Sequence, residues 1–162
     1  MSKQTSFRLA DLTRPEDARA VVELLDAYSS DPMGDGCPLS DEARRNLASG
    51  LLAHPTTEIL MAFHDGAAVG LAICFRGFST FAARPLLNIH DFFVSPTARG
   101  MKIGPGLMAA VIEHARSLEC CKVTLEVQER NLLARRLYEA AGFTQACYTK
   151  EAGGQLFFSK RL

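Results

Sequence analysis

The chain has 162 residues, of which 48% are hydrophobic, so it is long enough for one domain with a sizeable core. Its 18 basic and 18 acidic residues cancel, and this balance argues against a nucleic-acid or membrane-surface partner. No apolar run approaches the roughly 18 residues of a membrane span, and residues 1–12 lack the apolar core of a signal peptide. We therefore expect a single cytoplasmic domain over residues 1–162.

Cysteine and histidine spacing indicates neither disulfides nor a metal. The cysteines are odd in number and irregularly spaced: Cys37, Cys74, Cys120, Cys121 and Cys147. No pair of cysteines or histidines has the spacing of a zinc site. We expect no metal, and we expect the cysteines within apolar runs to be small core residues.

The N-terminal half alternates strand and helix signals. Residues 6–10 predict a first strand, and the pattern Thr13-Arg14-Pro15-Glu16 predicts a helix start with a capping box. A polar loop is expected over residues 29–39, after which Ser40 should cap a second helix. Strands are expected over residues 57–64 and 67–75, joined by a hairpin turn at Asp65-Gly66, and an extension of the second strand to Phe78 stays open.

The C-terminal half predicts two strand–helix units and a last hairpin. The expected strands are residues 86–94 and 122–127, each followed by a helix, residues 104–118 and 131–141. Gly142 should end the last helix in a left-handed conformation, and residues 143–149 and 155–160 should form a terminal hairpin. This order predicts an α+β domain with a mixed, mostly antiparallel central sheet of about seven strands, flanked by about four helices.

Residues 88–106, NIHDFFVSPTARGMKIGPG, combine a strand, a glycine-bearing loop and a helix start. The first N–H groups of a helix have no intrahelical partner and lie at its positive dipole end, so they favour phosphate. The segment lacks the GxxxxGK[ST] pattern of P-loop proteins and the GxGxxG pattern of dinucleotide-binding folds. By itself it fits either an anion site or an ordinary glycine turn.

The same segment resembles motif A of the GCN5-related N-acetyltransferase (GNAT) family, Gln/Arg-x-x-Gly-x-Gly/Ala, which cradles the pyrophosphate of coenzyme A. Arg99 and Gly104 are in register, whereas Lys102 stands at the first motif glycine. If the loop needs a positive φ there, Lys costs about 1 kcal/mol relative to Gly, although it could also place a cation beside the pyrophosphate. The resemblance implies acetyl-CoA as co-substrate, held by Arg99, Gly100, Met101, Lys102, Ile103, Gly104, Pro105 and Gly106.

Residues 131–143 resemble GNAT motif B, Asn-x-x-Ala-x-x-x-Tyr-x-x-x-Gly-Phe, at every specified position. The resemblance implies that Tyr138 protonates the leaving thiolate as a general acid, while Asn131 and Arg135 contact the cofactor. Without that context, Tyr138 would be an aromatic at the edge of the core, and Asn131 would be useful as a helix cap in either case.

In GNAT proteins the two strands that correspond to residues 86–94 and 122–127 splay apart, and the pantetheine arm enters the gap. The resemblance implies that the backbone of Phe92, Phe93 and Val94 holds this arm. The side chains of these three residues fit an ordinary core.

Attack by an amine requires loss of the ammonium proton, so a base or a water relay is expected. The candidates are first His90, or a water it polarises, and then Asp91; the two precede Phe-Phe-Val as a Glu-Asp pair does in the diamine acetyltransferase branch, similar to spermidine/spermine N-acetyltransferases. His90 could equally be a hydrogen-bonded sheet residue. Because successive strand residues face opposite sides, we expect His90 and Asp91 not to share one role.

GNAT proteins usually bind the acceptor with the first two helices and their loop. The residues of this region that could bind an amine are Asp26, Tyr28 and Asp31, with Phe78 lining the same cleft. A solvated polar loop, and a dimer contact at Phe78, are the alternatives.

The resemblance therefore implies an N-acetyltransferase that moves an acetyl group from acetyl-CoA to a small-molecule primary amine within a ternary complex. A non-catalytic coenzyme A-binding module, a protein N-terminal or lysine acetyltransferase, and transfer of a longer acyl group or transfer to a hydroxyl stay open. A homodimer is the expectation from base rates and family habit.

Overall fold

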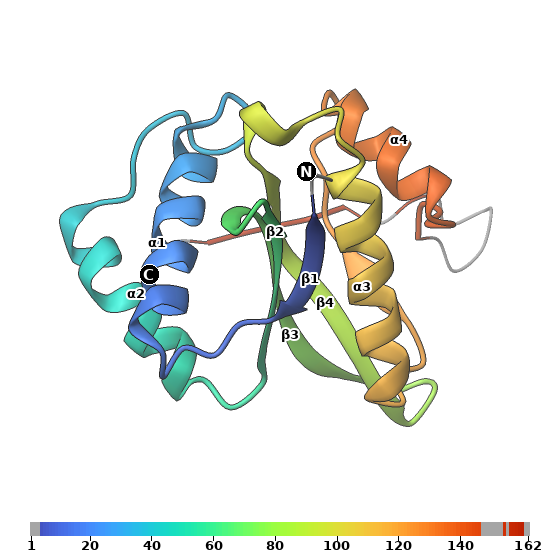
Figure 1. Ribbon diagram of the computed structural model, residues 1–162. Coiled ribbons are helices and arrows are strands. Elements are labelled where there is room, and N and C mark those ends of the chain that lie inside the picture. Colours follow the sequence, from blue (N-terminus) through green and yellow to red (C-terminus); the bar gives the residue numbers. More distant parts are fainter. Residues whose placement is uncertain (1–3, 147–153, 155, 161–162) are drawn as a thin grey trace.

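A central sheet separates two layers of helices (Figure 1). The computed structural model describes residues 4–146, 154 and 156–160. Helices α1 and α2 cover one face of the sheet, and α3 and α4 lie on the other side. The elements are β1 (Thr5–Leu9), α1 (Pro15–Ser30), α2 (Asp41–Ala53), β2 (Thr57–His64), β3 (Ala67–Ser79), β4 (Arg84–Val94), the 3-10 turn η1 (Pro96–Ala98), α3 (Ile103–Ser117), β5 (Val123–Leu125) and α4 (Leu132–Ala140).

The strands lie in the order β1-β2-β3-β4-β5, so each strand pairs with its neighbour in the chain. The pairs are antiparallel except β4–β5, which is parallel and joined by the crossover helix α3. This arrangement confirms the expected α+β class with a mixed, mostly antiparallel sheet. Within the described residues the sheet has five strands rather than about seven. Residues 143–146 and 156–160 form no strand, and the rest of the expected terminal hairpin lies outside the described residues.

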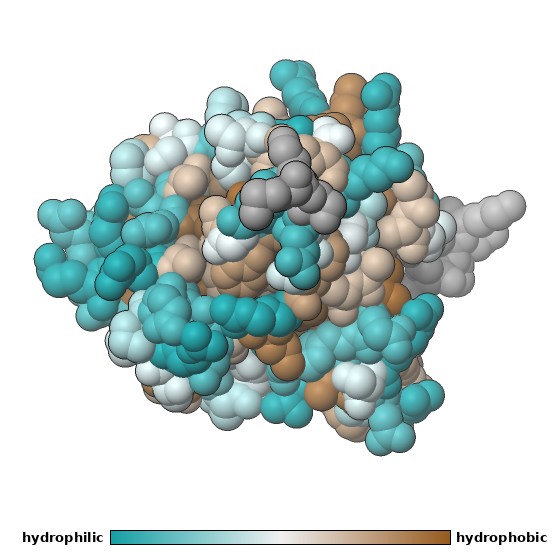
Figure 2. Space-filling view, in the orientation of Figure 1, coloured by the Kyte–Doolittle hydropathy of each residue, from teal (hydrophilic) through white to brown (hydrophobic). Residues whose placement is uncertain are grey.

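The core has two parts because alternate strand residues point to opposite faces of the sheet. One cluster packs between the sheet and α3 and includes Leu60, Leu87 and Leu107. The other packs between the sheet and α1 and includes Val21, Met61 and Leu71. Helix α2 has no buried residue, and Figure 2 shows hydrophilic side chains over its outer surface. No helix among the described residues is long and apolar enough to cross a membrane.

Local signals at the helix ends are mostly confirmed. The Ser40 side chain caps α2 by accepting a hydrogen bond from the Ala43 N–H, and Gly142 follows α4 with a φ of 91°. The capping box predicted for α1 is wrong, because the N-cap residue is Arg14 and has no side-chain cap. The Thr13 hydroxyl instead donates to Asp11, while Pro15 occupies the first turn, where its missing N–H costs nothing.

Candidate active site

A cleft opens where β4 and β5 separate. The two strands pair only from Leu87 to Ile89 on β4, yet β4 continues to Val94. The resulting cleft has a volume of about 850 Å³. Its walls come from the end of β4, the start of α3, the β5–α4 loop and helix α4. The splayed strands and their cleft lie where the resemblance placed them.

A β-bulge in β4 decides which groups face this cleft. Cys74 on β3 lies opposite Ile89, but its neighbour Ile73 lies opposite Asp91, so His90 is an extra residue on β4. The bulge shifts the alternation of side chains by one position. Before it, Leu87 and Ile89 point into the α3 core; after it, even-numbered residues do so.

The same shift sets the direction of the backbone groups. The Leu87 N–H donates to the carbonyl of Lys122, the residue before β5, whereas the Ser95 N–H donates to the carbonyl of Val69 in β3. Backbone N–H and C=O groups point to alternate sides along a strand, and the extra residue in the bulge shifts this alternation by one position. The backbone groups of Phe92 and Val94 therefore face the cleft. Phe93 lies opposite Leu71 and turns its backbone toward β3. Of the three residues expected to hold the pantetheine arm, two therefore have the required backbone direction.

The loop after β4 leads into α3 through two residues with positive φ. Gly100 has a φ of 81° and Lys102 has a φ of 59°, so the non-glycine residue at the motif position is left-handed. Lys102 is the N-cap of α3 without a side-chain cap, and the first helical bond runs from the Gly106 N–H to Lys102 O at 3.2 Å. The N–H groups of the first turn are thus free to bind an anion, and Gly104 and Pro105 line the cleft.

Tyr138 reaches the cleft from α4. Its side chain is 8% exposed, with its ring edge-on to Phe92 and tilted against Phe143, 6.1 Å between centroids in each pair. Burial raises the pKa of the phenol to about 12. No group of the described residues hydrogen-bonds this hydroxyl, so it is available to a ligand in the cleft.

The other two motif B residues have different surroundings. Asn131 lines the cleft, and its side-chain oxygen accepts a hydrogen bond from the Ala134 N–H at 3.1 Å, so it caps α4. Arg135 lies outside the cleft lining, where its guanidinium donates to Glu129 O at 3.1 Å. The position of Arg135 therefore gives no support to a cofactor contact.

His90 and Asp91 lie on the same face of the sheet, which corrects the expectation from simple alternation. Asp91 is paired with Ile73 of the α1 cluster, and the His90 ring is edge-on to Phe75 of that cluster at 5.5 Å. The bulge is the reason, because it places two consecutive residues on one side. Burial raises the pKa of Asp91, an effect that the neighbouring His90 partly offsets. Within the described residues, no donor hydrogen-bonds the Asp91 carboxylate.

Two of the four expected acceptor residues line the cleft. Tyr28 packs against Phe93, with 5.6 Å between ring centroids, and burial followed by the charge of Asp91 raises the pKa of its phenol. Asp31 also lines the cleft, but its carboxylate accepts from Arg99 at 2.8 Å.

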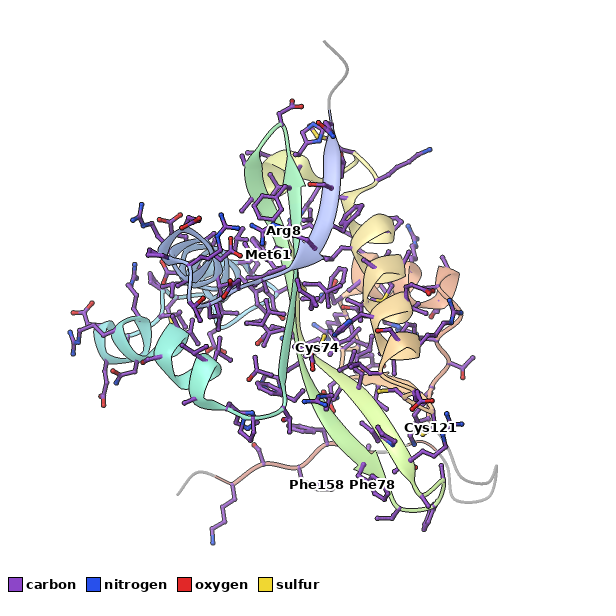
Figure 3. The ribbon with its side chains drawn as sticks, turned by 60° about the horizontal axis from the view of Figure 1, so that its bottom comes forward. Arg8, Met61, Cys74, Phe78, Cys121 and Phe158 are labelled. Atoms are coloured by element: carbon purple, nitrogen blue, oxygen red, sulfur yellow. The ribbon has the colours of Figure 1, made fainter. Side chains whose placement is uncertain are left out.

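The other two expected acceptor residues do not line the cleft. Asp26 binds the Leu39 N–H and the Arg44 guanidinium, and so holds α2 to α1. Phe78 is 61% exposed opposite Pro85, at the end of β4 remote from Val94. Figure 3 shows it at the far end of the β3–β4 hairpin. The expectation for Phe78 is wrong because β3 continues to Ser79 and carries it away from the cleft.

Sequence reasoning missed Met33 and Gln128, which line the cleft from two loops. The Gln128 side chain donates to Met33 O at 3.4 Å, although 95 residues separate the two in the chain. No local pattern marks either residue, since their proximity depends on how the loops meet.

Comparisons with known proteins agree with this geometry. Residues 20–143 match the sequence profile of the Acetyltransferase (GNAT) family. An uncharacterized N-acetyltransferase of Archaeoglobus fulgidus is 33% identical over 111 residues, 68% of this chain and 73% of the relative. A glucosamine 6-phosphate N-acetyltransferase of Trypanosoma brucei brucei is 29% identical over 128 residues, 78% of this chain and 82% of the relative.

Among solved structures, an aminoglycoside N-acetyltransferase in complex with coenzyme A superposes with a TM-score of 0.75. That similarity covers 100% of this chain and 98% of the other at 18% identity, so it shows the shared fold. With the splayed strands, the glycine loop and the motif B helix in place, the chain belongs to the GNAT family and is an acetyl-CoA-dependent acyltransferase.

Proposed function

We propose that the enzyme transfers an acetyl group from acetyl-CoA to the primary amine of a small molecule, by direct attack in a ternary complex. The observation that carries this proposal is the position of Asp91 and Tyr138, which approach the open end of β4 from opposite faces of the sheet. Tyr138 lines the cleft; Asp91 does not, but its charge raises the pKa of the cleft residue Tyr28, so the two groups would lie on either side of the thioester.

The cleft has the groups that coenzyme A requires. The N-terminus of α3 provides N–H groups and a positive dipole for the diphosphate. The backbone groups of Phe92 and the Val94 N–H, which pair with no neighbouring strand, provide an edge for the amides of the pantetheine arm. The volume of about 850 Å³ is large enough for a cofactor arm and a small acceptor.

Each proposed proton transfer uses a group whose burial suits it. Acetyl-CoA, when bound, supplies the acetyl group as a thioester. Asp91, or a water molecule it holds, removes a proton from the acceptor ammonium, and burial strengthens it as a base by raising its pKa. The Tyr138 phenol, protonated at neutral pH because its pKa is about 12, donates its proton to the departing thiolate sulfur. The nitrogen–carbon bond forms as the carbon–sulfur bond breaks, and the amide nitrogen gives up its second proton to solvent.

The acceptor is a polyamine-like or amino-acid-like amine by first choice, with a protein N-terminus or lysine as the second. Support for a cationic acceptor comes from Tyr28, whose pKa is raised by burial and then by the charges of Asp91, Asp31 and Asp35. A negative potential at this phenol attracts an alkylammonium group. The homodimer stays an expectation, which sedimentation would test.

The test is a thiol-release assay with acetyl-CoA against a panel of diamines, amino acids, glucosamine 6-phosphate and a peptide, beside calorimetric titration with coenzyme A. Turnover with small amines, at a rate that depends on Tyr138, is the expected result. Coenzyme A binding with turnover only on the peptide would reject the small-molecule acceptor. Absence of coenzyme A binding would reject the cofactor site itself.

A further inference from the structure

The half-exposed side chain of Arg99 folds back over the end of β4. Its Nε donates to Val94 O at 3.2 Å, on the strand edge that faces the cleft. Its terminal nitrogen donates to the Asp31 carboxylate at 2.8 Å, and its guanidinium lies 5.9 Å from the centre of the Phe93 ring. Arg99 thus joins β4 to the end of α1, across 68 residues of sequence.

Asp31 continues these contacts toward the opposite wall. One oxygen of its carboxylate binds Arg99, and the other accepts from the Met33 N–H at 2.9 Å. Met33 O in turn accepts from the Gln128 side chain on the β5–α4 loop. We call these four residues, Arg99, Asp31, Met33 and Gln128, the Asp31 bridge; all of them line the cleft.

The loop conformation that places Asp31 in the cleft depends on Gly34. The Gly34 N–H donates to Asp31 O at 2.8 Å, and this turn brings the glycine against the end of α1. A Cβ at Gly34 would lie 2.2 Å from the carbonyl oxygen of Tyr28, which no side chain tolerates. The bridge is therefore built into the backbone at the end of α1, directly after the cleft residue Tyr28.

We propose that Asp31 is a positioning residue, which ties the loop between α1 and α2 to the end of β4 and to the β5–α4 loop rather than binding the amine. Both of its oxygens already have partners on the protein, and the Met33 N–H and Arg99 keep its pKa below the ordinary value. The proposal rests on the proposed function, because it assumes that the cleft holds the cofactor arm. It corrects the expected role of Asp31 as a ligand for the acceptor.

Loss of this tie affects both substrates. Arg99 hydrogen-bonds the Val94 carbonyl, so this carbonyl is not open to the cofactor arm. The groups left for the arm on this strand edge are the Val94 N–H and the N–H and C=O of Phe92. Once released from Asp31, the guanidinium is free to move along the cofactor channel, and the loop next to Tyr28 loses its tie to β4. Cofactor affinity and acceptor affinity should therefore weaken together, while the proton-transfer groups stay in place.

The test variant is Asp31→Asn. The amide oxygen that this substitution introduces can still accept from the Met33 N–H, and the NH₂ group then faces Arg99. Because an NH₂ group cannot accept a hydrogen bond from the guanidinium, only the contact with Arg99 is lost. We expect the Kd for coenzyme A and the KM for the amine each to rise about fivefold, with kcat changed by less than about twofold. Asp31→Glu should restore most of both affinities.

The matched control is Arg44→Gln. It removes the 2.8 Å ion pair with Asp26, which holds α2 to α1. The same loop leads into α2, but neither residue of this pair lines the cleft. Both pairs join a half-exposed arginine to a largely buried aspartate. Arg44→Gln should leave the coenzyme A Kd unchanged, and an equal rise in Kd for this variant would overturn the proposal.

A double variant tests whether Asp31 affects coenzyme A binding through Arg99 or through a general loosening of the loop. In an Arg99→Gln background, Asp31→Asn should cause no further rise in the coenzyme A Kd. An undiminished fivefold rise in that background, or an unchanged Kd in Asp31→Asn alone, overturns the inference while leaving the cofactor site intact. Wild-type protein that binds no coenzyme A would instead reject the proposed function, and this inference with it.

Discussion

Asp91 and Tyr138 reach the open end of β4 from opposite faces of the sheet, one from the α1 side and one from the α3 side. The strand between them keeps the proposed proton acceptor apart from the proposed proton donor. Burial raises the pKa of both groups, which would strengthen the carboxylate as a base and would keep the phenol protonated for its proposed role.

Replacement of Tyr138 by Phe removes only the hydroxyl, which no group of the described residues hydrogen-bonds. We expect kcat for thiol release to fall about 100-fold, a typical contribution of general acid catalysis, with an unchanged melting temperature. Calorimetry should show an unchanged Kd for coenzyme A. Because the pKa of Tyr138 is about 12, the wild-type pH–rate profile should show no alkaline limb from this group below about pH 10. Retention of wild-type kcat would contradict the role of Tyr138.

Replacement of Asp91 by Asn should lower kcat by a factor of about 100 or more while raising stability at neutral pH. The folded-state pKa of Asp91 is raised, so the folded protein holds this proton more tightly than the unfolded chain. The ionised carboxylate therefore destabilises the fold as pH rises above about 4, the unfolded value, and the stability gain of Asp91→Asn should vanish below it. Thermal denaturation from pH 3 to 8 measures this gain.

His90→Gln tests the competing assignment of the base. The His90 ring lies against Phe75 at the exposed bulge, and its charge lowers the Asp91 pKa. We expect a modest loss of kcat, about tenfold or less, with the acidic limb of the pH–rate profile retained. If His90→Gln abolishes that limb and Asp91→Asn preserves it, then the histidine is the base.

Lys102→Gly should raise stability and weaken cofactor binding. The residue has a φ of 59°, so Gly should gain about 1 kcal/mol by relieving the left-handed conformation. Loss of the cation beside the proposed diphosphate site should raise the coenzyme A Kd by about two- to fivefold, an effect that added salt should diminish.

Ala83→Gly is the matched control for Lys102. Ala83 has a φ of 49° in the turn between β3 and β4, far along the hairpin from the cleft. It should show a similar stability gain with an unchanged coenzyme A Kd. A tighter Kd in Lys102→Gly would mean that the lysine hinders the cofactor instead of binding it.

Asp17→Asn should destabilise the protein at neutral pH by about 1–2 kcal/mol. Asp17 is 2% exposed and accepts two hydrogen bonds from Arg8, which together with the Asp11 N–H lower its pKa to about 2. The stabilisation is present above pH 4 and is lost as the pH falls toward 2. Solvent screens the ion pair because the Arg8 side chain is 40% exposed, so the loss of stability is smaller than the change in pKa alone implies. Equal melting temperatures of variant and wild type at pH 7 would contradict this assignment.

The features that could be predicted from the residues are those with local causes. Ser40 and Asn131 cap the helices that follow them, Asp65-Gly66 forms the hairpin turn, and Gly142 takes a left-handed conformation after α4. Caps, turns and helix faces depend on residues within a few positions, so their spacing is legible in the chain. The spacing of motif B likewise placed Tyr138 on the side of α4 that faces the cleft.

The features that could not be predicted involve partners far apart in sequence. The bulge at His90 depends on how β4 pairs with β3, and it reverses the alternation that the sequence alone predicts for His90 and Asp91. Arg99 and Asp31 meet only because the end of β4 and the end of α1 converge at the cleft. Register and long-range ion pairs follow from the packing of whole elements, and so the tertiary structure alone decided that the Asp31 carboxylate is paired with Arg99 while the Asp91 carboxylate has no hydrogen-bond donor among the described residues.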